Sequence, residues 1–284
     1  MTHLLRMQGR STAAPATMPA PIGIFDSGIG GVSVLRALRA RLPAERFIYV
    51  ADSGHAPYGD LPAQAIEERA AEVARFLLQR RARALVIACN TASVLAAAGL
   101  RRRHGLPIVA MEPAIKPAVQ ATRSRVVLVL ATTMTVRSAS VARLCREHGA
   151  GVRIILQACP GLADAAERAE FDSAATRVLL RRYLRPGLAE GADTIVLGCT
   201  HYAFLIDAIA AIAGPAVHIV EPSAAIAMQL ARVLPPVADV PRAVAVPAGA
   251  AATSFYTSGS AERLSTFLRA VGEPAAEVSA LPAA

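Results

Sequence analysis

Short apolar runs alternate with longer amphipathic stretches along most of the chain. The runs are rich in Val, Ile and Leu, which is typical of strands that are buried on both faces of a sheet. The stretches between them repeat their apolar residues every three or four positions, as helices do when one side packs on a core. This alternation predicts an α/β fold with mainly parallel sheets. Strands are expected at 21–25, 47–51, 84–88, 107–111, 125–131, 152–158, 194–198, 217–220 and 253–257.

Helices are expected between these strands, at 32–42, 63–80, 204–213, 224–233 and 261–271, with others that end near 104, 147 and 189. In the helix at 63–80 the apolar residues recur at helical spacing and form one stripe. Its charged residues, Arg69 among them, are expected to lie mostly in solvent. Residues 1–20 have no apolar periodicity and no continuous apolar stretch, so we expect a disordered leader that the fold does not need.

Two segments of the chain share one pattern, in which a buried strand, a cysteine and a polar pair precede a helix, a strand and Glu-Pro. In the first copy Cys89 precedes Glu112 by 23 residues, and in the second Cys199 precedes Glu221 by 22 residues. Two related units that face each other would place their thiols on opposite walls of a shared cleft. We therefore expect two pseudo-symmetric α/β domains, made of 21–113 plus 223–284 and of 114–222, with the active site between them.

Two opposed thiols suit a racemase, which removes a proton from one face of a carbon and returns one to the other. A thiol serves as acid or base because a helix N-terminus readily lowers its pKa. No lysine and glycine pattern indicates pyridoxal phosphate, so a mechanism without a cofactor is expected. We expect no metal site either, with His201 as a neighbour that handles protons rather than a metal ligand.

Polar residues and glycines also follow the first expected strand, as Asp-Ser-Gly-Ile-Gly-Gly at 26–31. The glycine spacing does not fit a dinucleotide fingerprint, and no Lys follows as it would in a P-loop. The backbone N–H groups of this loop could face a ligand. The segment could equally be a tight turn in which Asp26 caps the following helix, and the sequence leaves both alternatives open.

Composition and charge argue against some classes of protein and some binding partners. The 284 residues are 54% hydrophobic and can bury a sizeable core, but no apolar run is long enough to span a bilayer. The formal net charge is +9, almost all from arginine. These arginines are scattered over helix faces without interleaved aromatic residues, which favours solvated surface over a nucleic-acid site. The four cysteines permit disulfides, but nothing else in the sequence indicates secretion, and in a reducing compartment such cysteines are core or chemically active residues.

Four motifs together resemble the glutamate racemases of the aspartate/glutamate racemase family, over roughly residues 21–271. They are Asp-Ser-Gly-Ile-Gly-Gly at 26–31, Pro-Tyr-Gly at 57–59, Ala-Cys-Asn-Thr-Ala-Ser at 88–93 and Gly-Cys-Thr-His-Tyr at 198–202. Related aspartate racemases typically lack the residues that stand here as Ser93 and His201. Ala163-Asp164 and Ala203 depart from the usual family pattern. These departures bear on the shape of the local loops and on the role of Glu167.

The resemblance implies a role for each matching residue. Cys89 and Cys199 are expected to be the proton donors and acceptors, with Cys89 acting on the D-enantiomer and Asp26 and His201 assisting the nearer thiol. Substrate contacts are implied for Asp26, Ser27, Tyr58, Gly59, Asn90, Thr91, Thr200 and His201. Glu167, Thr132 and Thr135 match further positions near the site. Cys145 and Cys159 match no catalytic position and are expected to be structural.

The resemblance also implies a reaction and partners. It implies conversion of L-glutamate to D-glutamate for peptidoglycan synthesis, by a cytoplasmic enzyme that is often a homodimer and has no membrane partner. The alternative is a racemase of the same fold that acts on aspartate or a hydantoin. A single-thiol enzyme of this fold, such as a decarboxylase, fits less well because both thiols are present. Association with nucleic acid or with gyrase, reported for some glutamate racemases, is compatible with the net charge, but no residue demands it.

Overall fold

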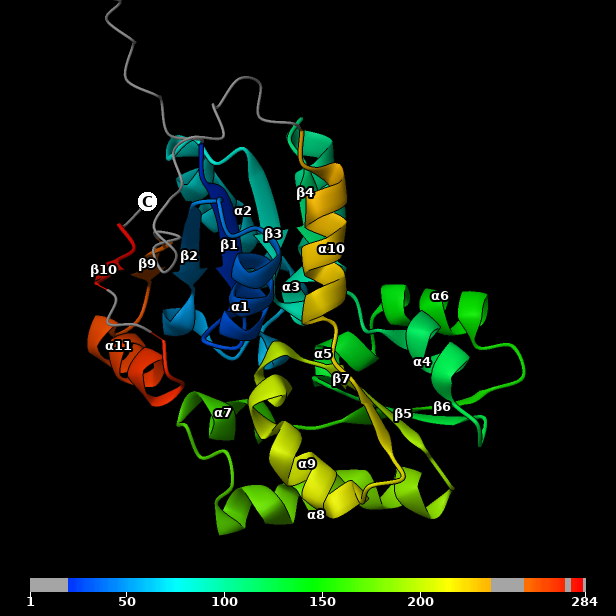
Figure 1. The fold of residues 1–284 in the computed structure, drawn as a ribbon. Coiled ribbons are helices and arrows are strands. Elements are labelled where there is room, and N and C mark those ends of the chain that lie inside the picture. Colours follow the sequence, from blue (N-terminus) through cyan, green and yellow to red (C-terminus); the bar gives the residue numbers. More distant parts are fainter. Residues whose placement is uncertain (1–19, 236–252, 274–276, 283–284) are drawn as a thin grey trace, which may run out of the picture.

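The computed structural model describes residues 20–235, 253–273 and 277–282, in which the chain forms two parallel β-sheets, each covered by helices on both faces (Figure 1). The leader expected at 1–20 lies outside the described residues, apart from Ala20. None of the helices in the described ranges is both long and apolar enough to cross a bilayer. The α/β class with mainly parallel sheets is confirmed.

The first sheet has six strands in the order β10-β9-β2-β1-β3-β4. Its strands are β1 (Ile22–Asp26), β2 (Phe47–Ala51), β3 (Ala84–Ile87), β4 (Ile108–Ala110), β9 (Thr253–Thr257) and β10 (Val278–Ala280). Helices α1 (Val32–Arg41), α10 (Ser223–Val233) and α11 (Ala261–Ala270) cover one face, and α2 (Ala63–Gln79) and α3 (Asn90–Arg103) cover the other. We call this sheet with its helices unit 1.

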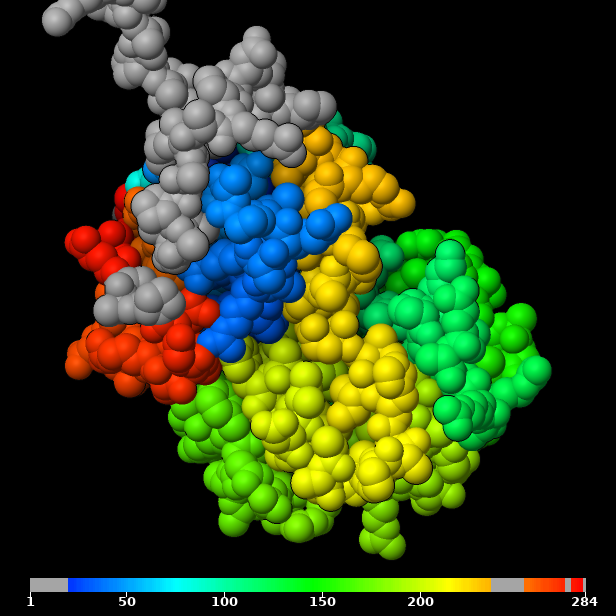
Figure 2. All heavy atoms as spheres, viewed as in Figure 1, coloured from blue at the N-terminus to red at the C-terminus, as the bar shows by residue number. Residues whose placement is uncertain are grey.

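The second sheet has four strands in the order β6-β5-β7-β8. Its strands are β5 (Val126–Ala131), β6 (Arg153–Ala158), β7 (Thr194–Gly198) and β8 (His218–Val220). Helices α4 (Ile115–Ala121) and α6 (Ala139–His148) pack on one face, and α7 (Leu162–Glu167), α8 (Ala174–Ala189) and α9 (Ile206–Ala213) pack on the other. We call this sheet with its helices unit 2; the two units lie directly against each other (Figure 2).

The strand order of unit 2 repeats that of unit 1. Strands β2-β1-β3-β4 and β6-β5-β7-β8 follow one scheme, in which β3 and β7, the strands that precede the two cysteines, hold the same place. All pairs are parallel, and the central strands β1, β2, β3 and β7 are buried along their whole length. Polar residues that follow these strands therefore gather at the carboxyl edges of the sheets, where open α/β sheets bind ligands.

Several local expectations were wrong. The pattern did not predict α4, which carries Pro117 inside it, or the three-residue edge strand β10. The helix expected at 204–213 begins instead with the 3-10 helix η3 (Thr200–Leu205) and becomes an α-helix at Ile206. The helix that ends near 147 is divided into α5 (Thr133–Val136) and α6, because the Ser138 hydroxyl accepts the N–H of Val141 and starts a new helix. The domain boundaries expected from the sequence stay a prediction.

Candidate active site

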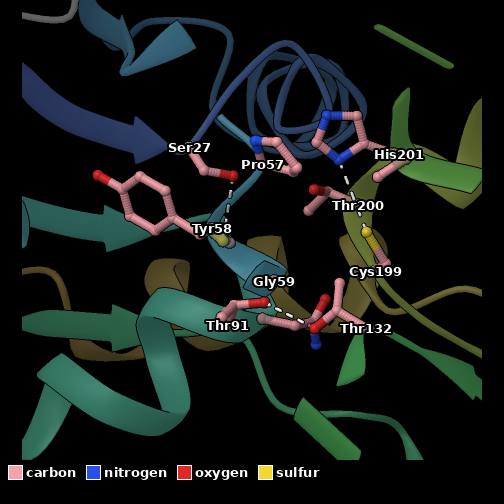
Figure 3. A pocket seen from close by; sticks show the side chains of 12 residues that line it. Ser27, Pro57, Tyr58, Gly59, Thr91, Thr132, Cys199, Thr200 and His201 are labelled. Carbon is pink, nitrogen blue, oxygen red and sulfur yellow. Dashed lines mark hydrogen bonds between the residues drawn. The ribbon is translucent and has the colours of Figure 1, made fainter. Parts of the chain in front are cut away.

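A small cavity lies between the two units, at the carboxyl ends of their strands (Figure 3). It holds about 280 Å³ of empty space, part of which is open to solvent. The residues that line it are Ser27, Pro57, Tyr58, Gly59, Cys89, Asn90 and Thr91 from unit 1, and Thr132, Ala163, Cys199, Thr200 and His201 from unit 2. The tertiary structure thus brings both repeated cysteines to one cavity.

Cys89 is held at the start of α3, just after β3. Its Sγ accepts the N–H of Ala92 at 3.4 Å, and its S–H donates to the Ser27 hydroxyl at 3.4 Å. Burial, together with the negative charge of Asp26, raises the pKa of the Cys89 thiol to about 12, although the contacts to Ser27 and Ala92 act in the opposite direction. Cys89 is therefore a neutral thiol at neutral pH, and the lowered pKa expected for a thiol at a helix N-terminus is not found here, because burial outweighs the helix contacts.

Cys199 lies at the start of η3 and contacts an imidazole. Its Sγ is 3.6 Å from Nδ1 of His201, whose Nε2 is 2.6 Å from a carboxylate oxygen of Glu167. Burial alone would lower the pKa of His201, but its hydrogen bonds to Cys199 and Glu167 outweigh burial and raise the pKa well above its ordinary value. The contact with the sulfur allows the imidazole to take part in proton transfer at Cys199.

Asp26 links the two cysteine corners. It is fully buried, and its carboxylate accepts hydrogen bonds from the Thr200 hydroxyl at 3.1 Å and from the Ser27 hydroxyl at 3.2 Å. Since Ser27 in turn accepts the S–H of Cys89, Asp26 reaches that thiol through one hydroxyl. Burial raises the pKa of Asp26, although nearby His201 lowers it.

Two backbone N–H groups of the loop at 26–31 donate to protein carboxylates rather than facing a ligand. The Ile29 N–H donates to Glu167 at 3.0 Å, and the Gly31 N–H donates to Asp26. Unit 2 packs so closely on this loop that a Cβ at Gly28 would lie 1.8 Å from Oε1 of Glu167. The glycines thus allow close approach of the two units, and Asp26 stabilises the turn before α1.

Tyr58 and Gly59 form a wall of the cavity, in the 3-10 helix η2 (Tyr58–Asp60). The Tyr58 hydroxyl points away from the cavity (Figure 3) and donates to the buried carboxylate of Asp52 at 2.6 Å. Asp52 also accepts two hydrogen bonds from Arg69. Arg69 is therefore not mostly in solvent, as its helical position had indicated: its side chain is 19% exposed. Sequence reasoning did not select Asp52 or Arg69 as site residues.

Asn90 presents an unused amide to the cavity. The residue is 1% exposed, and neither its amide nitrogen nor its oxygen has a hydrogen-bond partner among the described residues. A buried amide without partners is unfavourable unless a ligand or water satisfies it. The Asn90 amide is therefore available to hydrogen-bond a ligand or water in the cavity.

Three threonine hydroxyls connect the units at the cavity floor. Thr91 of unit 1 lies 2.9 Å from Thr132 and 3.3 Å from Thr135, both of unit 2, measured between Oγ1 atoms. The structure therefore places Thr91 and Thr132 on the lining and Thr135 directly behind them. Glu167 touches His201 but does not line the cavity, and Cys145 and Cys159 are not among the lining residues either.

The repeated Glu-Pro motifs lie outside the cavity lining. Glu112 pairs with Arg143 at 3.6 Å, and both side chains are 46% exposed. Glu221 accepts hydrogen bonds from the N–H and hydroxyl of Ser223 at the start of α10. Ser93 bonds the backbone of Ile87 and Met111 and so joins β3 to the end of β4. These residues support the fold around the site.

Known proteins match both the sequence and the fold. Residues 22–231 match the family model of Asp/Glu/Hydantoin racemases. A glutamate racemase of Methylococcus capsulatus is 54% identical over 212 residues, which cover 75% of this chain and 78% of that protein. A glutamate racemase of Pseudomonas paraeruginosa is 48% identical over 254 residues, which cover 89% of this chain and 94% of that protein.

Solved structures agree with these matches. A glutamate racemase isoform from Bacillus anthracis superposes with a TM-score of 0.81 at 28% identity, covering 93% of this chain and 98% of that one. A glutamate racemase from Escherichia coli, solved in complex with L-glutamate and the activator UDP-MurNAc-ala, gives a TM-score of 0.79 at 31% identity, with coverages of 92% and 98%. On these grounds the chain belongs to the Asp/Glu/Hydantoin racemase family and is a racemase, an enzyme of the isomerase class.

Proposed function

We propose that this racemase interconverts L-glutamate and D-glutamate without a cofactor, using Cys89 and Cys199 as its two acid/base groups. The observation that carries the proposal is the place of the two thiols, which follow equivalent strands of the repeat and line one cavity. Each thiol has its own supporting groups, Asp26 through Ser27 on one side and His201 with Glu167 on the other.

The proton moves in one direction for each enantiomer. With L-glutamate, the Cys199 thiolate removes the α-proton, and the neutral Cys89 thiol gives its own proton to the opposite face of the carbon. With D-glutamate the roles are exchanged. His201 lies beside Cys199 and assists its proton transfer, while Asp26 and Ser27 orient the Cys89 S–H. Negative charge that develops on the substrate carboxylate is stabilised by N–H and hydroxyl donors of the lining.

Neutral donors are expected to hold the two substrate carboxylates. Asn90 offers a free amide, and Thr91, Thr132 and Thr200 offer hydroxyls around the cavity. Tyr58 and Gly59 contribute their surface rather than the phenol group. No Arg or Lys is among the lining residues in the part of the chain that the structure describes, so we expect charge to be balanced by His201 and by oriented dipoles. We propose glutamate rather than aspartate or a hydantoin as the substrate because the relatives at 54% and 48% identity are glutamate racemases.

The cellular role follows from the product. D-glutamate supplied by this reaction would enter peptidoglycan synthesis, and we therefore propose that the enzyme works in the cytoplasm.

We also propose that residues 21–113 with 223–284 and residues 114–222 form the two domains whose cleft holds the substrate, and that the protein works as a homodimer.

Turnover of D-glutamate in deuterated water tests the reaction and the two-base mechanism together. The thiol that protonates the product has exchanged with solvent, so the L-glutamate product should carry deuterium from the first turnovers. Recovered D-glutamate should stay unlabelled at that stage. Equal early labelling of substrate and product would contradict two separate bases. A clear preference for aspartate or a hydantoin in a substrate panel would contradict the choice of glutamate.

A further inference from the structure

A buried ion pair stands behind the cavity wall that Tyr58 and Gly59 form. Asp52 follows β2 and is fully buried, and Arg69 reaches it from α2 with Nε at 2.9 Å and Nη2 at 2.7 Å. These two parallel hydrogen bonds engage both carboxylate oxygens, so they fix the direction of the carboxylate as well as its position. Neither residue lines the cavity.

The fixed Asp52 carboxylate in turn holds the cavity wall through hydrogen bonds. Asp52 accepts the Tyr58 hydroxyl at 2.6 Å and also a hydrogen bond from the Ser258 side chain. Burial opposes the charge of Asp52, but the hydrogen bonds from Arg69 and Tyr58 lower its pKa. Burial and the neighbouring Asp52 raise the pKa of Tyr58, so its phenol stays protonated and keeps donating. The Tyr58 ring is thereby held from the side that faces away from the cavity.

The wall also meets unit 2. A Cβ on Gly59 would lie 3.0 Å from Cβ of Thr132, so no side chain separates η2 from the opposite wall. Thr132 is hydrogen-bonded to Thr91, which lines the same cavity. A small movement of η2 therefore changes the width of the cavity, and misplacing binding groups by about 1 Å is costly for an enzyme.

We propose that Arg69 and Asp52 are positioning residues for substrate binding. Their ion pair sets the place of Tyr58 and Gly59, and thereby the fit of the cavity to the substrate, without touching the reacting atoms. The inference rests on the proposed function only for the identity of the substrate. It predicts an effect on substrate affinity that is larger than the effect on proton transfer, because both thiols and their partners stay in place.

The test uses Arg69→Gln, which removes the ion pair, and Arg69→Lys, which keeps the charge but cannot form the two-pronged contact. Glu72→Gln is the matched control, because Glu72 is the other carboxylate partner of Arg69 and is 36% exposed, away from the cavity. The Kd for glutamate is measured by calorimetry and KM and kcat by racemisation. We expect Kd and KM to rise about tenfold in Arg69→Gln, with kcat changed less than about threefold.

Arg69→Lys should fall between Arg69→Gln and the parent chain, and Glu72→Gln should match the parent chain. An unchanged Kd in Arg69→Gln, or a fall in kcat at constant KM, would overturn the proposal. If both Arg69 variants fail to fold, the ion pair supports unit 1 as a whole, and the proposal is also wrong. The parent chain is measured first: absence of glutamate binding there counts against the proposed substrate and not against the role of Arg69.

Discussion

Glu167 holds His201 through a hydrogen bond of 2.6 Å between Oε1 and Nε2, while the same oxygen accepts the Ile29 N–H of unit 1 at 3.0 Å. One carboxylate thus orients the imidazole beside Cys199 and joins the units next to the cavity. His201 is 4% exposed, so its charge depends on this partner. The relationship makes the role of Glu167 testable.

Glu167→Gln should weaken proton transfer at Cys199 and shift its pH dependence. The charge of Glu167 is among the causes that raise the pKa of His201, so a neutral amide lowers that pKa. The imidazolium then loses its proton at a lower pH, and the alkaline limb of kcat/KM moves towards lower pH. We expect a fall in kcat of about tenfold to a hundredfold, measured over about pH 6 to 10. Asp164→Asn, on the same helix α7, is the control and should keep the parent profile.

Gly28→Ala should lower both activity and stability. The new Cβ would lie 1.8 Å from Oε1 of Glu167, which is the end of a flexible side chain and can swing away. That swing breaks the hydrogen bonds of Glu167 to His201 and to the Ile29 N–H, so activity should fall as in Glu167→Gln, and the free energy of unfolding should fall by about 1.5 to 3 kcal/mol. Gly105→Ala, where nothing lies within 4 Å of the added Cβ, is the control. Full activity in Gly28→Ala would contradict the proposed role of Glu167.

Cys89→Ser and Cys199→Ser should each abolish racemisation, with a loss of more than about a thousandfold, because a hydroxyl is a far weaker acid than a thiol. Racemisation is followed in both directions by circular dichroism. Cys145→Ser provides the control, since Cys145 lies on α6 outside the cavity lining and should be silent. The two-thiol mechanism is contradicted if either Cys89→Ser or Cys199→Ser keeps the activity of the parent chain.

Asn90→Ala should weaken glutamate binding without destabilising the empty protein by more than about 1 kcal/mol. The amide has no partner among the described residues, so its removal breaks no hydrogen bond in the absence of substrate. Loss of hydrogen bonds to a charged substrate should raise Kd by about tenfold to a hundredfold. The check is thermal unfolding with and without glutamate. A variant that is stabilised by glutamate as much as the parent chain would exclude Asn90 from the binding site.

Asp193→Asn should destabilise unit 2 by about 1 kcal/mol at neutral pH, because solvent around this partly exposed carboxylate screens hydrogen bonds that would be worth more if buried. The Asp193 carboxylate accepts the Thr122 hydroxyl at 2.6 Å and the N–H groups of Arg123 and Ser124 at 2.8 Å. Partial burial opposes its charge, but these hydrogen bonds hold the pKa of Asp193 well below its ordinary value. An amide in its place could still offer its oxygen to the two N–H groups, but it would lose the negative charge and turn an NH2 donor towards the hydroxyls of Thr122 and Thr194.

The advantage of the parent chain over Asp193→Asn should depend on pH. A depressed carboxyl pKa adds stability that is complete above the unfolded-state pKa of about 3.9 and is lost as the pH falls towards the folded-state value. Urea unfolding at neutral pH and at about pH 3 measures this difference. Asp207→Asn, at an exposed position of α9, should change stability by less than about 0.5 kcal/mol at either pH. A difference that is independent of pH would contradict the assigned role of Asp193.

The sequence by itself determined the alternation of strands and helices, the repeat and the two thiols. Strand burial and helical spacing are local properties, so the apolar pattern carries them directly. The polar pairs after Cys89 and Cys199 could be found for the same reason, since they stand at strand ends. The apolar pattern did not predict α4 and β10, because these elements are too short to show a period.

Only the tertiary structure decided which supporting groups meet. Glu167 reaches His201 across 34 residues, Thr91 meets Thr132 across 41, and Arg69 binds Asp52 from a helix whose charged residues were expected in solvent. These contacts arise from the packing of one element on another, and no periodicity of either element encodes its partner. The sequence therefore determined where the reactive groups stand, and packing decided their charge, their orientation and the shape of the cavity between them.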